Sequence, residues 1–233
     1  MSASADVLQR PDLVAVAAQE KTNFHQAAIR KANSWDPESF AREQIRGLVR
    51  RVFFAADDCS VKQIVFSAAD VHTDAAKICL QVGQALVLET RSDIALVNRG
   101  LADQTDIYRP HYFGKPSIKS WSTQIATNLW RVPECKLRQC AGEIGNPWPG
   151  ALAELRNEFE YAIIHAPAAD GSSEAALLGH LTDGMVLVLG AHSSRKASVC
   201  KVKQNLQSTG SRILGIVLSE RRFPVPEAIY RRL

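Results

Sequence analysis

Short, continuously apolar segments alternate with segments of helical pattern along most of the chain. The apolar segments are bounded by polar or turn residues and predict strands at Gln63–Ser67, Ile94–Val97, Asn128–Val132, Tyr161–His165, Met185–Leu189 and Ile213–Leu218. Apolar residues three or four positions apart predict helices at 39–55, Thr73–Leu88, Ala151–Phe159, Ser173–Leu181 and Ser194–Ser208. Strands that are apolar throughout are buried on both faces. The pattern therefore predicts an α/β fold, a doubly wound, mostly parallel sheet flanked by helices.

The same pattern indicates how the chain is divided. Residues 1–37 are rich in Ala and Gln and end at a proline, so we expect a peripheral N-terminal leader there. Residues 38–233 then form a single α/β domain. The connection 99–127 is irregular and rich in Tyr, His, Pro and Ser, and we expect it to be an exposed lid or contact loop.

Composition narrows the class of protein. An apolar share of 46% is ample for a packed core, and no apolar run is long enough to cross a bilayer. The N-terminus lacks a signal-peptide pattern, so we expect a cytoplasmic protein with reduced thiols. Cys135 and Cys140 alone are too few for a zinc site. The net charge of +4 comes from dispersed arginines without interleaved aromatic residues, which argues against a nucleic-acid partner.

The candidate site follows from the fold. Ligands of open parallel sheets bind beyond the carboxyl ends of the strands, which here are followed by the loops after Ser67, Val97, His165 and Leu189. The first of these loops joins a strand to a helix, the arrangement in which many proteins hold phosphate groups. It reads Ala68-Ala69-Asp70-Val71-His72-Thr73-Asp74 and contains no glycine and no lysine.

Several stretches of the chain resemble a known family in order and spacing. They are Phe159–Pro167 (FEYAIIHAP), Glu174–Leu178 (EAALL), Thr182–Leu189 (TDGMVLVL) and Gly210–Leu218 (GSRILGIVL). These stretches resemble the kinase domain of the bacterial tyrosine kinases (BY-kinases) of capsular and exopolysaccharide export, within the MinD/ParA-type P-loop ATPases. The resemblance covers roughly residues 38–220 and implies a P-loop NTPase-like fold.

The resemblance also implies nucleotide-binding positions that are altered here. The family's phosphate loop PGEGK[ST] falls on residues 70–75, so Asp74 stands in place of the lysine and Ala75 in place of the magnesium-binding hydroxyl. A motif similar to DADLR falls on 98–101, and the Walker B aspartate falls on His165. The degenerate site consists of Asp70, His72, Thr73, Asp74, Asn98 and His165. Carboxylates in this loop would repel a polyphosphate, so we expect binding of ATP and Mg²⁺ to be lost and no metal to be bound.

Structural roles also account for several of these residues. Thr73 fits the N-cap of a helix, and Asp74 in the first turn complements the helix dipole. The serines of His192-Ser193-Ser194 are explained as a cap of the next helix. His165 at a strand end fits a neutral, hydrogen-bonded histidine. A rebuilt metal or small-ligand site made of Asp70, His72, Asp74, Asn98 and His165 remains an alternative.

The helix 39–55 carries a second feature implied by the resemblance. BY-kinases have a ring-forming Glu-x2-Arg-x2-Arg signature at this place, and Glu43 and Arg46 match it, while the last arginine comes one position late, at Arg50. We expect Glu43, Arg46 and Arg50 to form a face for association with a second copy or a partner. Tyr230 is the only tyrosine near the C-terminus, where the family has a phosphorylated cluster.

The expected function is that of a catalytically inactive BY-kinase-like domain, a pseudo-kinase that serves as a binding or assembly module in polysaccharide biosynthesis and export. The resemblance implies a membrane protein of the export system as partner, through which a cytoplasmic domain would reach the membrane. Two alternatives stay open. One is a nucleotide-binding sensor without hydrolysis, and the other is an enzyme with a rebuilt metal or ligand site around His72, Asp74 and His165.

Overall fold

The structure is a computed structural model that describes residues 37–54, 61–99, 117–141 and 145–220. The chain divides into two compact units, and the larger one, Arg42–Arg222, contains nearly all of the described residues. Residues 1–36 of the predicted leader, Cys59 and Tyr230 lie outside the described residues, whereas Pro37, the last residue of the predicted leader, begins the first described helix.

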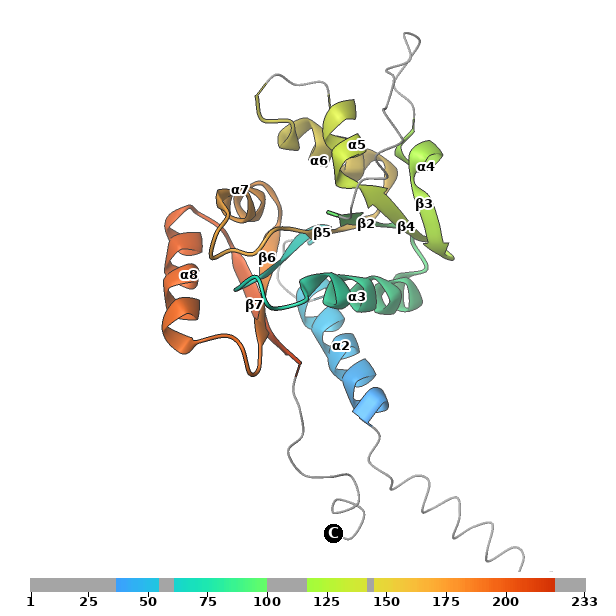
Figure 1. Cartoon of the computed structure of the whole chain (residues 1–233). Coiled ribbons are helices and arrows are strands. Elements are labelled where there is room, and N and C mark those ends of the chain that lie inside the picture. Colours follow the sequence, from blue (N-terminus) through green and yellow to red (C-terminus); the bar gives the residue numbers. More distant parts are fainter. Residues whose placement is uncertain (1–36, 55–60, 100–116, 142–144, 221–233) are drawn as a thin grey trace, which may run out of the picture. The chain divides into compact units, whose positions relative to one another are not determined.

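The described elements alternate between helices and strands, except that β4 follows β3 directly and α6 follows α5 (Figure 1). The helices are α2 (Pro37–Phe53), α3 (Ala75–Thr90), α4 (Ile118–Trp121), α5 (Glu134–Cys140), α6 (Trp148–Glu158), α7 (Ser173–Leu181) and α8 (Lys196–Ser208). The strands are β1 (Gln63–Ala68), β2 (Ile94–Asn98), β3 (Thr123–Ala126), β4 (Leu129–Pro133), β5 (Tyr161–His165), β6 (Gly184–Gly190) and β7 (Ile213–Ser219).

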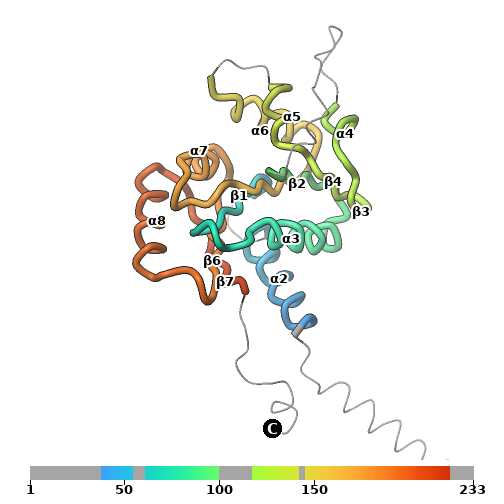
Figure 2. Tube along the Cα trace, in the orientation of Figure 1, coloured from blue at the N-terminus to red at the C-terminus, as the bar shows by residue number. Residues whose placement is uncertain are grey.

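The strands form one seven-stranded sheet in the order β3-β4-β2-β5-β1-β6-β7. All neighbours pair in parallel except β3, which pairs antiparallel with β4. The order means that the chain leaves each parallel strand through a helix before it returns to the sheet, which Figure 2 lets the reader follow by colour. The predicted fold class, a doubly wound and mostly parallel α/β sheet, is confirmed.

Alternation of side chains along the strands builds a core on each face of the sheet. In β1, Ile64 and Phe66 pack with α2 and α3 residues on one face, while Val65 packs with residues of α6, α7 and α8 on the other. In β6, Val186 and Leu187 divide between the two faces in the same way. Both faces are therefore covered, which explains why the strands read as continuous apolar runs.

The amino end of β1 is fixed by a polar cluster around Asp183. The Asp183 carboxylate accepts hydrogen bonds from the backbone N of Lys62 at 2.8 Å, the backbone N of Gln63 at 2.7 Å and Nη2 of Arg156 at 2.7 Å. Gln63, which is buried, accepts from Nε of Arg156 at 3.1 Å and donates to the carbonyl of Leu152 at 2.8 Å. This cluster ties β1 to α6 and to the start of β6, at the opposite end of the strand from the candidate site.

The predicted boundaries agree best where a strand or helix is bounded by clear polar residues. β5 and α7 agree at both ends, whereas the short elements α4, β3 and α5 were not predicted. The expectation of a loop over 99–127 is wrong from residue 118 on, and residues 100–116 lie outside the described part. The carboxylate of Glu158 accepts from the backbone N of Ile118 at 2.7 Å and so fixes α4 from a distant part of the chain.

Candidate functional site

The candidate site lies at the carboxyl edge of the sheet. Because β2, β5, β1 and β6 are parallel neighbours, the loops that follow them start at the same edge. Asp70, His72, Thr73 and Asp74 lie between β1 and α3, Asn98 ends β2 and His165 ends β5. The fold therefore places all six predicted residues at one edge.

The Asp70 carboxylate is the centre of the loop between β1 and α3. Its Oδ1 accepts hydrogen bonds from the backbone N of His72 at 3.1 Å and from Oγ1 of Thr73 at 3.0 Å. Its Oδ2 accepts a short hydrogen bond from Oγ of Ser194, in the loop after β6. The loop thus uses an amide and two hydroxyl donors to bind its own carboxylate.

These hydrogen bonds lower the pKa of Asp70. Partial burial raises the pKa of its carboxyl group, but the hydrogen bonds from Ser194, Thr73 and the backbone N of His72 outweigh that effect. The pKa of Asp70 is consequently below its ordinary value. At neutral pH the loop holds a negative charge in place.

The loop after β6 completes the enclosure of Asp70. The Ser194 hydroxyl accepts from the backbone N of Gly190 at 3.0 Å, and the Thr73 and Ser193 hydroxyls lie 3.5 Å apart. A Cβ atom at Gly190 would lie 2.0 Å from Oγ of Ser193 and 2.9 Å from Oγ1 of Thr73, so a side chain at this position would displace these hydroxyls. The expectation that the serines cap the next helix is wrong, since α8 has Arg195 as its N-cap without a side-chain hydrogen bond.

Asp74 has a structural role at the start of α3. It is the N-cap residue, and its Oδ1 accepts from the backbone N of Lys77 at 3.2 Å. The expectation that Thr73 is the cap is wrong by one residue, because the Thr73 hydroxyl is used by Asp70 instead. The N-cap position of α3 therefore has a carboxylate where an anion would bind to a helix N-terminus.

His165 and Asn98 meet across the ends of β5 and β2. Nδ1 of His165 lies 3.3 Å from Oδ1 of Asn98, a hydrogen bond when Nδ1 carries the proton. Burial lowers the pKa of His165, and the nearby charge of Arg99 lowers it further, against the opposing effect of Asp74. The imidazole is therefore neutral at pH 7. It adds no cationic charge for phosphate groups and has no oxygen ligand for Mg²⁺.

The positions of the described side chains test the alternative of a rebuilt metal site at the carboxyl edge of the sheet. Within the described ranges, no three His, Cys, Asp or Glu side chains gather closely enough to hold a metal ion. Asp70 and Asp74 each bind donors of their own loop, and His165 pairs with Asn98.

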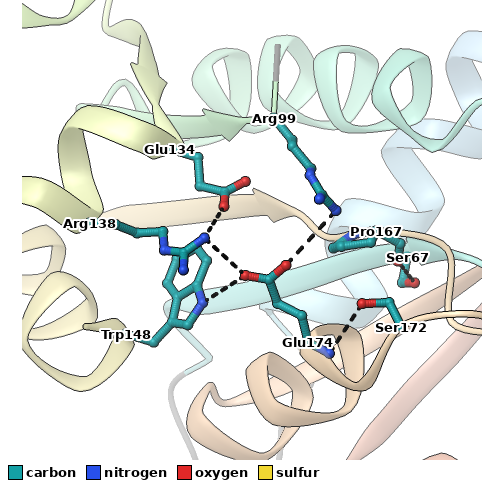
Figure 3. Close-up of polar contacts among 8 residues, drawn as sticks. All are labelled: Ser67, Arg99, Glu134, Arg138, Trp148, Pro167, Ser172 and Glu174. Carbon is teal, nitrogen blue, oxygen red and sulfur yellow. Dashed lines mark hydrogen bonds and ion pairs between the residues drawn. The ribbon is translucent and has the colours of Figure 1, made fainter. Parts of the chain in front are cut away.

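A second group of polar contacts surrounds Glu174 in the first turn of α7 (Figure 3). Its carboxylate accepts from Nε1 of Trp148 at 3.1 Å and lies 3.4 Å from Nη1 of Arg138 and 3.9 Å from Nη1 of Arg99. Arg138 also pairs with Glu134 at 3.1 Å. Sequence reasoning missed this cluster, because its members come from four separate segments and match no local motif. It joins α5, α6 and α7 at the carboxyl edge and uses the charge of Arg99.

The predicted association face lies on α2. Arg50 Nη2 lies 3.2 Å from Oε1 of Glu89 on α3, so this arginine joins two helices of the same chain. Glu43 and Arg46 are exposed and 4.0 Å apart. Of the three residues, Arg50 is the one with an ion pair that links α2 to the domain.

Comparisons with known proteins relate this chain to bacterial tyrosine kinases. No family model matches the chain. The tyrosine-protein kinase CpsD of Streptococcus agalactiae serotype III is 33% identical over 69 residues, a match that spans 30% of this chain and 30% of the relative's length. The putative tyrosine-protein kinase CapB of Staphylococcus aureus is 22% identical over 203 residues, which is 79% of this chain and 86% of the relative.

Solved structures agree in fold. The VpsO kinase domain superposes with a TM-score of 0.58 at 16% identity, over 79% of this chain and 98% of that one. MinD of Aquifex aeolicus gives a TM-score of 0.51 at 15% identity, over 69% of this chain and 70% of that one. The predicted family resemblance is confirmed: the chain is similar in sequence to bacterial tyrosine-protein kinases, and it has the fold of the VpsO kinase domain and of MinD.

Proposed function

We propose that this chain is a BY-kinase-like pseudo-kinase, a domain without nucleotide chemistry that serves as a binding or assembly module in polysaccharide biosynthesis and export. One observation carries the proposal. The carboxylate of Asp70 takes the loop donors of His72, Thr73 and Ser194, and so stands in for the anion that a phosphate loop would bind.

The charges of the loop support this step. A phosphate loop offers backbone N–H groups and a lysine to an anion. Here Asp70, whose hydrogen bonds lower its pKa, is ionised at pH 7, and Asp74 caps the helix whose positive dipole end would otherwise attract phosphate. Two carboxylates within a few ångströms of a triphosphate would each repel it by about 1 kcal/mol or more. ATP would therefore have to displace internal hydrogen bonds and overcome repulsion at the same time.

The loss of magnesium ligands supports the same conclusion. Mg²⁺ is held by hard oxygen ligands near the phosphates. At the ends of β5 and β2 the chain presents His165, which is neutral, and Asn98, whose side-chain oxygen lies 3.3 Å from the His165 ring. At these two strand ends, a bound triphosphate would therefore find no carboxylate to hold Mg²⁺ or to orient its water ligands.

Two points support the proposed role as a binding or assembly module: the resemblance to BY-kinases and the exposed residues of α2. The BY-kinase resemblance implies a membrane protein of the export system as partner, and Glu43 and Arg46 remain exposed on α2 for contact with it or with a second copy. No helix in the described part of the chain is long and apolar enough to cross a membrane. In this proposal, the partner brings the domain to the membrane.

A phosphotransfer assay tests the proposal. The purified chain is incubated with Mg²⁺ and γ-labelled ATP beside the VpsO kinase domain as a positive control, and label on tyrosine is measured. We expect no label on Tyr230. Incorporation that disappears in the Tyr230→Phe variant would contradict the proposal, because it would demonstrate catalysis by this chain.

A further inference from the structure

A basic surface lies on helix α8 and strand β7, at one end of the sheet (Figure 1). Residues 184–219 contain no Asp or Glu, and their net charge of +5 exceeds the +4 of the whole chain. The positive side chains, all of them exposed, are those of Arg195, Lys196, Lys201, Lys203 and Arg212. A region of the surface that carries charge of one sign favours a partner of the opposite sign.

The described part of the chain does not neutralise these cations. None of the five forms an ion pair with a described carboxylate. Elsewhere in the domain, by contrast, Lys62, Lys119 and Arg156 pair with carboxylates at 2.9, 2.7 and 2.7 Å. The positive charge of α8 is therefore available to an anionic partner.

Two of the lysines lie on the side of α8 that is next to β7. The helix buries Val202 and Leu206 against the sheet, and Lys196 and Lys203, seven positions apart, lie within about 20° of each other beside this buried stripe. The connection from β6 through α8 to the parallel strand β7 is a right-handed crossover, in which this side of the helix is directed toward β7. Val199, between the lysines and the stripe, is only partly buried, as expected beside the open end of the sheet.

Two large apolar side chains are exposed beside this flank of α8. Ile216 pairs with Leu187 and Leu218 with Leu189, in the part of β7 where the register is regular. Leu187 packs in the same core as the buried residues of α8, so Ile216 and Leu218 point to the α8 face of the sheet. They are 50% and 60% exposed. Aliphatic side chains and lysines thus lie next to one another on one surface.

We propose that the α8–β7 surface, made of Lys196, Lys203, Ile216 and Leu218, binds directly to an anionic lipid bilayer. The lysines contact lipid phosphates, and the two aliphatic side chains enter the boundary between headgroups and acyl chains. Lysine stems are long enough to keep their ammonium groups at the headgroups while their neighbours enter this boundary.

The combination of residues favours a bilayer over other anionic partners. Lysines alone would fit any polyanion, but a nucleic acid backbone has no apolar layer that would remove Ile216 and Leu218 from water. A bilayer interface provides both the charge and the apolar layer. The inference does not depend on the nucleotide site, on α2 or on a membrane-protein partner.

Vesicle flotation with the full chain tests the proposal. Binding to vesicles of phosphatidylcholine with about 30% phosphatidylglycerol should be at least about tenfold stronger than binding to phosphatidylcholine alone. The double variant Lys196→Ala/Lys203→Ala should weaken binding to the anionic vesicles by about twentyfold, since each lysine near the surface contributes about fivefold. Ile216→Ser/Leu218→Ser should weaken it by about tenfold, because the apolar contact is lost while the charge is kept.

A matched control separates this surface from the net charge of the chain. Arg51→Ala/Lys77→Ala removes the same charge from exposed positions of α2 and α3, on the opposite face of the sheet, and should change vesicle binding by less than about threefold. Equal urea midpoints would show that all variants are folded.

Three results would each overturn the proposal. They are an original chain with no preference for anionic vesicles, vesicle binding that survives the change of both α8 lysines, and equal losses in the α8 variant and its control. Binding to duplex DNA that Lys196→Ala/Lys203→Ala abolishes, without any binding to vesicles, would assign the surface to a nucleic acid instead.

Discussion

The Asp70 carboxylate binds the hydrogen-bond donors of its own loop. Asp70 lies where the family resemblance places the first residue of the motif, and it bridges its own loop to Ser194 in the loop after β6. The amide of His72 and the hydroxyls of Thr73 and Ser194 are then satisfied without a ligand. These contacts stabilise the loop from within the chain.

Removal of this carboxylate should cost stability. In Asp70→Ala, one amide and two hydroxyl donors lose their acceptor, and we expect the free energy of unfolding to fall by about 1–3 kcal/mol. Urea denaturation at pH 7 measures the change. Asp170→Ala, which removes an exposed carboxylate in the turn before α7, is the matched control and should change stability by less than about 0.5 kcal/mol. Equal stability of the two variants would show that the Asp70 contacts contribute nothing.

The elements show how far local pattern predicts this fold. β5 and α7 were predicted at both ends, because an apolar run and a helical repeat are each bounded by polar residues. Local pattern does not predict α4 or the hydrogen bond between Ser194 and Asp70. Glu158 fixes α4 from 40 residues away, and Ser194 is 124 residues from Asp70. The positions of the site residues at one edge followed from the strand order, but their partners required the structure.

The polar cluster around Asp183, which ties β1 to α6 and β6, should make the free energy of unfolding depend on pH. Burial raises the pKa of Asp183, but the hydrogen bonds from Arg156, Gln63 and Lys62 outweigh it and leave the pKa below its ordinary value. A carboxyl group with a lowered pKa in the folded state stabilises the protein above its unfolded pKa, about 3.9, and this contribution is lost as pH falls below that value.

Asp183→Asn should therefore lower the free energy of unfolding by about 1.5–3 kcal/mol at pH 7, and by less near pH 3. Urea denaturation from pH 7 to pH 3 measures both effects. Glu160→Gln removes an exposed carboxylate paired with Lys62 at 2.9 Å and is the control, with an expected change under about 1 kcal/mol. A loss of stability that is the same at every pH would contradict the assignment to the Asp183 charge.

For the whole molecule, the fold is kept at low sequence identity. The apolar alternation of the strands keeps the sheet and both core layers, and the chain superposes on a BY-kinase domain with a TM-score of 0.58 at only 16% identity. At the carboxyl edge of the sheet, polar side chains form hydrogen bonds with one another, as Asp70 does with Thr73 and Ser194. Since core packing needs only side chains of suitable size and polarity, a fold persists through changes that remove a ligand site.

Calorimetric titration of Mg-ATP into the purified chain at pH 7 tests the central claim most directly. Because Asp70 and Asp74 occupy the loop and the start of α3, we expect no saturable heat with a dissociation constant below about 1 mM. Stoichiometric binding of Mg-ATP at micromolar affinity would contradict the account and would favour a nucleotide-binding sensor.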